Sequence, residues 1–79
     1  MDEWLERRAD ALSAGAGVPR EELELSAQEI VVLLDVAGHA AHASGARTNA
    51  PLLCYLLGRA QAQGSRGLDE LVEIVRSTS

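Results

Sequence analysis

One segment of the chain, residues 26–42, constrains the fold more than any other. It opens with Ser-Ala-Gln-Glu at 26–29, where a hydroxyl at the helix start and a carboxylate three residues later match a capping box. Apolar side chains then occupy nearly every position from Ile30 to Ala37. Since a helix that is apolar on every side belongs in a protein interior, we predict a buried, central helix over 26–42.

Three other segments also show helical spacing of their apolar residues. Asp2 is a good cap for the first of them, and Gly15 and Gly17 are expected to stop it. Pro19 permits a short helical turn after these glycines, and Pro51 suits the first turn of a later helix. The expected helices cover about residues 2–14, 50–63 and 68–76, with a frayed tail at 77–79.

These elements predict an all-α protein, a compact irregular bundle of three to four short helices in a single domain over residues 1–79. A chain of this length rarely gains more than ~3–5 kcal/mol from its hydrophobic core. Cys54 is the only cysteine, so no disulfide within the chain can add stability. A metal, a protein partner or self-association would have to supply the rest.

The balance of charge restricts the class of partner. Twelve Asp and Glu residues against seven basic residues give a formal net charge of −5. Because phosphate backbones and anionic lipids require a basic surface, neither nucleic acid nor a membrane is an expected partner. The sequence begins Met-Asp-Glu without a basic and apolar leader, and its longest strictly apolar run, Ile30–Leu34, is too short to span a bilayer. We expect a cytoplasmic protein.

The first candidate site lies within the central helix. Asp35, His39 and His42 are spaced i, i+4 and i+7, so they share one helix face. Carboxylate and imidazole groups in such a row are ligands for zinc, iron or manganese, but a fourth ligand is needed. Cys54 or a second copy of the chain could supply it. We favour the alternative of a structural polar stripe, in which Asp35 bonds His39, and we predict no metal and no cofactor.

The second candidate is the polar loop before the third helix. The guanidinium group of Arg47 can donate two parallel hydrogen bonds to a carboxylate or phosphate. Free N–H groups at a helix start also attract anions. An anion site would combine Asp35, His42, Arg47, Thr48 and Asn49. In the alternative, Thr48 or Asn49 caps the helix, while Arg47 pairs with Asp35 or with a helix C-terminus. The loop lacks the glycines and the lysine of a nucleotide-hydrolysing phosphate loop.

An enzymatic function is the least expected. Leucine and tyrosine neighbours around Cys54 indicate a buried thiol that packs as a small hydrophobe, although His39 or His42 could in principle activate it. A helical chain of this size also has little room for the concave pocket that catalysis requires.

Residues 33–58, LLDVAGHAAHASGARTNAPLLCYLLG, carry a resemblance to a known family. The stretch resembles a family of small uncharacterised bacterial all-helical domains. The similar features are an Asp-containing helix, a histidine at His42, Arg47, the run Ala50-Pro51-Leu52 and a leucine-rich helix that ends in glycine. Such domains occur alone, or fused to or encoded near molybdenum cofactor guanylyltransferases. Residues 2–5, Asp-Glu-Trp-Leu, are also similar to the first residues of that family's domains. The resemblance implies an accessory role near maturation of that cofactor, and it singles out Asp35, His42, Arg47, Asn49 and Pro51.

The leading hypothesis is a non-enzymatic helical accessory or interaction module that binds a protein partner or forms a homodimer. Four short helices do not readily cover both the central helix and the leucine stripe of residues 50–63. At ~25 cal/mol per Å², about 200 Å² of apolar surface left in water forgoes ~5 kcal/mol, which is comparable to the whole stability of a small domain. The alternative is a small-anion or metal-binding domain that uses Asp35, His39, His42 and Arg47.

Overall fold

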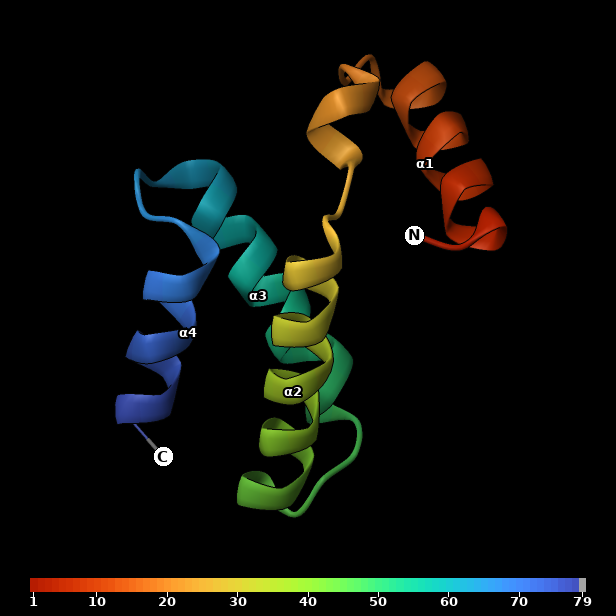
Figure 1. The fold of residues 1–79 in the computed structure, drawn as a ribbon. Helices are drawn as coiled ribbons and strands as arrows, with labels where there is room; N and C mark the ends of the chain where they lie inside the picture. The colour runs from red at the N-terminus through yellow and green to blue at the C-terminus, as the bar shows by residue number, and fades with distance from the viewer. Residues whose placement is uncertain (79) are drawn as a thin grey trace. The chain divides into compact units, whose positions relative to one another are not determined.

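A computed structural model describes residues 1–78, and its regular secondary structure within this range is entirely helical (Figure 1). The helices are α1 (Glu3–Ala16), α2 (Ala27–Ser44), α3 (Asn49–Gln63) and α4 (Leu68–Ser77), with a short 3-10 helix, η1 (Arg20–Leu23), after Pro19. No strand occurs within the described residues, so the all-α prediction is confirmed. Every predicted helix bound lies within two residues of the observed one. Of the tail expected to fray, Ser77 belongs to α4, Thr78 forms a turn, and Ser79 lies outside the described residues.

The chain consists of two compact units, residues 1–30 and residues 31–79. The N-terminal unit contains α1, η1 and the first turn of α2, and the C-terminal unit contains the rest of α2 with α3 and α4. The single domain expected over residues 1–79 stays a prediction.

Side chains define the starts of α1 and α2 as the sequence predicts. The carboxylate of Asp2 accepts a hydrogen bond from the N–H of Leu5 at 2.9 Å. At the start of α2, the N–H of Ser26 donates to Glu29 Oε1 at 2.8 Å, and the N–H of Glu29 donates to Ser26 Oγ at 3.1 Å. These reciprocal bonds satisfy two amide groups that have no partner within the helix, which confirms the capping box.

The end of α1 depends on one glycine rather than two. Gly17 adopts a left-handed conformation, with φ of 69°, and its N–H donates to the carbonyl of Ser13 at 3.0 Å. Only glycine takes this conformation without steric cost, so the helix ends there. Gly15, expected to stop the helix as well, lies inside it.

Arg20 holds the N-terminal unit together. Its guanidinium reaches from η1 to two carboxylates of α1, Glu6 at 2.6 Å and Asp10 at 2.7 Å, and also contacts Glu24 at 2.9 Å. The pKa of Arg20 is raised, chiefly by the hydrogen bond to Asp10; desolvation opposes this shift, and the negative charges of Glu24 and Glu6 add to it. Because the Arg20 side chain is only 26% exposed, these contacts are partly shielded from solvent.

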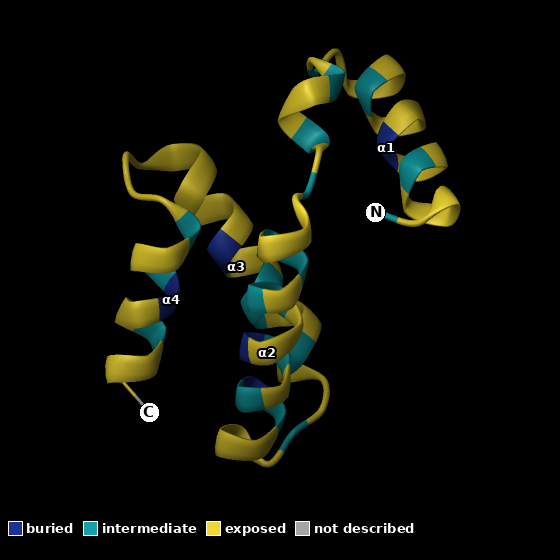
Figure 2. Ribbon diagram, in the orientation of Figure 1, coloured by how far each residue is buried: buried dark blue, intermediate teal, exposed yellow. Residues whose placement is uncertain are grey.

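The core of the C-terminal unit is small and is built from one residue of each helix. Val36 of α2, Leu57 of α3 and Val72 of α4 are buried together (Figure 2). A ring of partly buried side chains packs around them: Val32, Leu53, Cys54, Leu68, Leu71 and Val75. Val36 is fully buried, so it marks the centre of this unit.

Burial of α2 differs from the prediction. Only Val36 and Ala40, one turn apart, are buried, whereas Val31 and Leu34 are 62% and 70% exposed. The predicted helix buried on every side is therefore corrected to one with a single buried face, because its covering core residues all lie on one side. Although α2 is the most apolar of the helices, no described helix is long and apolar enough to cross a membrane.

Replacing Leu57 by alanine tests this core. Leu57 is 3% exposed, so the substitution leaves a cavity and should lower the free energy of unfolding by about 2–5 kcal/mol, enough to unfold most of the protein. The matched control is Leu52→Ala on the same helix, where 59% of the residue is already exposed and the change should stay within about 0.5 kcal/mol. Urea unfolding followed by circular dichroism measures both. Equal losses would contradict the assigned core.

Replacing Arg20 by glutamine should lower the melting temperature and speed amide hydrogen exchange in α1, since the contacts between η1 and α1 lose their charge. The matched control is Arg7→Gln, because Arg7 pairs only with Glu3 inside α1 and both side chains are at least 70% exposed. The difference between the variants should shrink in 1 M salt, where the Debye length falls to about 3 Å. A melting temperature equally sensitive to both substitutions would show that Arg20 has no special role.

Candidate functional site

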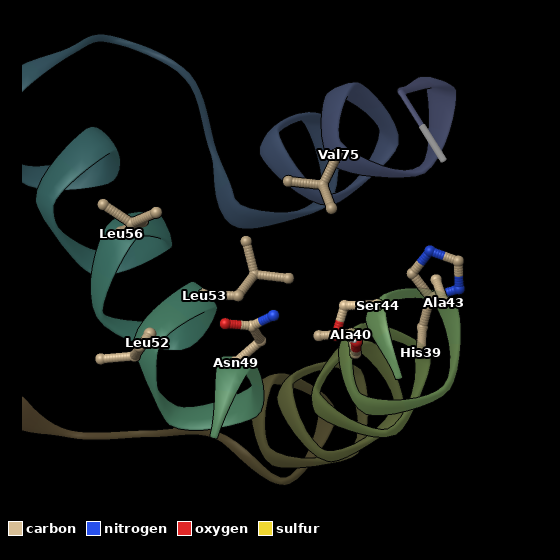
Figure 3. A pocket seen from close by; sticks show the side chains of 9 residues that line it. All are labelled: His39, Ala40, Ala43, Ser44, Asn49, Leu52, Leu53, Leu56 and Val75. Atoms are coloured by element: carbon tan, nitrogen blue, oxygen red, sulfur yellow. Dashed lines mark hydrogen bonds between the residues drawn. The ribbon is translucent and has the colours of Figure 1, made fainter. Parts of the chain in front are cut away.

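An apolar groove of ≈ 290 Å³ lies between α2, α3 and α4 in the C-terminal unit (Figure 3). Six of the nine residues that line it are apolar. Figure 3 shows the Val75 side chain pointing from α4 toward the side of the groove that α2 and α3 form. The lining residues are His39, Ala40, Ala43 and Ser44 of α2, Asn49, Leu52, Leu53 and Leu56 of α3, and Val75 of α4.

The turn between α2 and α3 positions the two long walls of this groove. Gly45 takes a left-handed conformation, with φ of 73°, that allows the chain to reverse directly after α2. The hydroxyl of Ser44 fixes the turn, because it donates to the carbonyl of Ala40 at 2.6 Å and accepts from the N–H of Ala46 at 3.2 Å. The groove is hollow because α2 contributes small side chains, Ala40 and Ala43, to this wall.

Leu52 and Leu56 form the outer edge of the groove, and we call this pair the leucine ridge. They are four residues apart on α3 and therefore lie on the same face. Each is 59% exposed, whereas Leu53 next to them packs against the core. Single exposed leucines are ordinary on protein surfaces, but adjacent ones beside an apolar hollow are typical of an interaction surface.

Two of the polar residues named from the sequence, Asn49 and His39, line this groove. Asp35 contacts a residue that the sequence did not indicate. Its carboxylate accepts a charge-assisted hydrogen bond from Arg76 and so connects α2 with α4. Pairing of Arg47 with Asp35 was one of two alternatives considered for this arginine, and in the structure it is Arg76 of α4 that contacts this carboxylate.

The predicted anion cluster is not assembled by contacts. His42, Arg47 and Thr48 are exposed, and within residues 1–78 no hydrogen bond or ion pair joins any two of the five cluster members. Thr48 occupies the cap position of α3 but makes no side-chain capping bond there. Over the same described part of the chain, no three His, Cys, Asp or Glu side chains are grouped so that they could hold a metal ion.

The groove offers apolar contact rather than reactive groups. His39 is the only ionisable side chain among its lining residues. Cys54 is half-buried and does not line the groove; its Sγ lies 4.0 Å from the carbonyl oxygen of Leu33. The lining of the groove therefore contains an imidazole but no thiol. It can accept aliphatic side chains, with His39, Ser44 and Asn49 as polar contacts along the edge.

The leucine stripe of α3 was predicted from the sequence to need a protein partner or a second copy, but its leucines were not named as site residues. The signal was present, since a stripe that includes Leu52, Leu53 and Leu56 is wider than one helix contact needs. The contributions of Ala40, Ala43 and Val75 were missed. Alanine and valine give no chemical signal in a sequence, and only packing of the three helices brings these residues together.

A family model with the description "domain of unknown function (DUF6457)" matches residues 1–79. Neither a curated protein nor a solved structure matches the chain. The family match agrees with the predicted family of small domains without an assigned activity. The association with molybdenum cofactor guanylyltransferases stays a prediction.

The ion pair between Asp35 and Arg76 can be tested by a double-mutant cycle of Asp35→Asn and Arg76→Gln. Both side chains are partly exposed, so the coupling free energy should be about 0.2–1 kcal/mol at low salt and smaller in 1 M salt. A parallel cycle of Asp35→Asn with Arg47→Gln should give no coupling. Coupling to Arg47 instead of Arg76 would restore the pairing first expected from the sequence.

Proposed function

We propose that this chain, which belongs to the family described as domain of unknown function DUF6457, is a non-enzymatic interaction module. In this proposal it forms a homodimer in the cytoplasm. One observation carries the proposal: the leucine ridge stands exposed beside an apolar groove on the same unit. A ridge and a groove on one surface are the two halves of a self-complementary contact.

A two-fold symmetric dimer uses this complementarity twice. In such an interface the same patch of both copies meets, so the ridge of each copy faces the groove of the other. Leu52 and Leu56 form an i, i+4 ridge of the kind that packs between the side-chain rows of another helix. In the proposed dimer they contact Ala40 and Ala43 of the second copy.

The energy of this contact is modest. Fully burying a leucine is worth about 1.5–3 kcal/mol, so covering the exposed 59% of one ridge leucine is worth ~0.9–1.8 kcal/mol. Four such leucines in a symmetric interface contribute ~4–7 kcal/mol. With the other groove contacts offsetting the cost of association, this corresponds to a dissociation constant of about 10 µM to 1 mM.

The distribution of charge supports contact through the C-terminal unit. Residues 31–79 contain four acidic residues and four arginines, for a net charge of zero. Residues 1–30 contain eight acidic residues and three arginines, which accounts for the whole net charge of −5. Two C-terminal units therefore meet without net repulsion, whereas two N-terminal units repel each other.

A non-enzymatic role is supported by the composition of the groove. Catalysis by a nucleophile requires a base within hydrogen-bond reach of it, and the one hydroxyl of the lining, that of Ser44, instead donates to the carbonyl of Ala40 at 2.6 Å. The alternative of an anion-binding or metal-binding domain has less support, since the members of that cluster make contacts elsewhere or are exposed.

The family resemblance suggests which other protein to test for binding. Domains that resemble residues 33–58 are fused to or encoded near molybdenum cofactor guanylyltransferases, so an enzyme of that class is the first candidate partner of the module. Pull-down of the purified enzyme by the tagged chain tests this finer proposal. An enzyme that is retained neither by the wild type nor by a monomeric variant would remove it and leave the homodimer unaffected.

Dimerisation is tested by sedimentation equilibrium from about 10 µM to 1 mM. The wild type should shift from monomer to dimer within this range, while Leu52→Ser combined with Leu56→Ser should stay monomeric. Leu34→Ser is the matched control, because Leu34 is 70% exposed but does not line the groove, and this variant should dimerise like the wild type. A wild type that remains monomeric at 1 mM, or a Leu34→Ser variant that alone loses dimerisation, would contradict the proposal.

A further inference from the structure

The leucine ridge is the middle of a longer row of exposed side chains on α3. Asn49, Leu52, Leu56 and Arg59 follow one another at intervals of three, four and three residues, and all four are exposed. Figure 3 shows the first three of them along the helix. Alternating intervals of three and four keep side chains on one face, as in the contact seam of a coiled coil. We call these four residues the α3 seam, in which two leucines are flanked by an amide and a guanidinium.

The two polar groups of the α3 seam are available for hydrogen bonds to another molecule. Within residues 1–78, the side chain of Asn49 makes no hydrogen bond. The Arg59 guanidinium lies 5.7 Å from the centroid of the Tyr55 ring, and no carboxylate of the described residues pairs with it. The sequence of α3 contains no acidic residue. The α3 seam therefore offers an amide oxygen as acceptor at one end and a guanidinium as donor at the other.

Exchange of ridges between two copies brings their α3 helices side by side, because the ridge is also the outer edge of the groove. A two-fold axis can relate two such helices in two ways. If the axis runs along the helices, they are parallel, and each residue of the α3 seam meets its own counterpart. Arg59 then faces Arg59 of the second copy.

If the axis instead crosses the helices at the middle of the ridge, they are antiparallel. Leu52 of each copy then meets Leu56 of the other. Asn49 precedes Leu52 by three residues, and Arg59 follows Leu56 by three residues, so these two positions also meet. The antiparallel arrangement therefore sets the acceptor of each copy opposite the donor of the other.

Building on the homodimer proposed above, we propose that Asn49 and Arg59 determine its register. The two α3 helices pair antiparallel, and Arg59 of each copy donates to the side-chain oxygen of Asn49 in the other. The parallel arrangement is disfavoured because it places two guanidinium groups against each other, whereas the antiparallel one gives each of them an acceptor. Polar residues within an apolar helix contact select one register in the same way in coiled coils. The leucines supply affinity, and the flanking polar residues supply specificity.

The sign of one substitution's effect on the dissociation constant distinguishes the two registers. In the antiparallel dimer the carboxylate introduced by Asn49→Asp faces Arg59 of the second copy, and this pair occurs twice. The dissociation constant should therefore fall about threefold to tenfold in 50 mM salt, as expected for two exposed ion pairs. In a parallel dimer two carboxylates would face each other, and the constant would rise. Sedimentation equilibrium measures it, and the substitution suits the start of a helix, where a negative charge is favourable.

Thr48→Asp is the matched control, because it adds the same charge at an exposed position next to the α3 seam but outside it. This variant should change the dissociation constant less than about twofold. Adding Arg59→Gln to Asn49→Asp should remove the gain in affinity. The gain should also disappear in 1 M salt, where the Debye length is about 3 Å.

Failure of this inference differs from failure of the homodimer. A wild type that dimerises while Asn49→Asp weakens the dimer would overturn the antiparallel register and leave the homodimer intact. Equal effects of Asn49→Asp and Thr48→Asp, or a gain that persists after Arg59→Gln, would do the same. If neither the wild type nor Asn49→Asp dimerises at about 1 mM, the homodimer and the inference built on it both fail.

Discussion

The C-terminal unit depends on one packing contact, the buried cluster of Val36, Leu57 and Val72. Each of three helices supplies one buried residue to it, so no pair of helices forms the core without the third. Ala40, the next buried residue along α2, keeps that helix close to its neighbours but also leaves room beside it. The same choice of a small residue thus packs the helices and opens the groove. Stability and a binding surface arise here from one packing arrangement.

A core this small determines what the rest of the sequence does. The chain has many more large apolar side chains than the buried set can include, and Leu52, Leu56, Leu34 and Trp4 remain exposed. Exposed apolar side chains forgo about 25 cal/mol for each Å² left in water, so their position on a protein is informative. On the C-terminal unit they border a groove in a region of zero net charge, and on the N-terminal unit they lie within a strongly acidic region. The surface of the C-terminal unit is therefore suited to a second copy of the chain.

Local features of the fold were predictable from the sequence, because they depend on neighbouring residues. The Ser26–Glu29 capping box, the Asp2 cap and all four helices follow from residues within a few positions of each other. Which side of α2 is buried was not predictable, because apolar residues surround that helix and only contact with α3 and α4 distinguishes its faces. For the same reason Arg76 could not be identified as the partner of Asp35, since 41 positions separate them. Of the predicted polar site, Asn49 and His39 reach the groove, but they do so as parts of a mainly apolar lining.

The most direct measurement of the central claim is an isotope-filtered nuclear Overhauser experiment on a mixture of labelled and unlabelled chains at about 1 mM, where a weak dimer is populated. The account predicts intermolecular contacts from the methyl groups of Leu52 and Leu56 in one copy to those of Ala40 and Ala43 in the other. Intermolecular contacts confined to Val31 and Leu34, or none at this concentration, would contradict it.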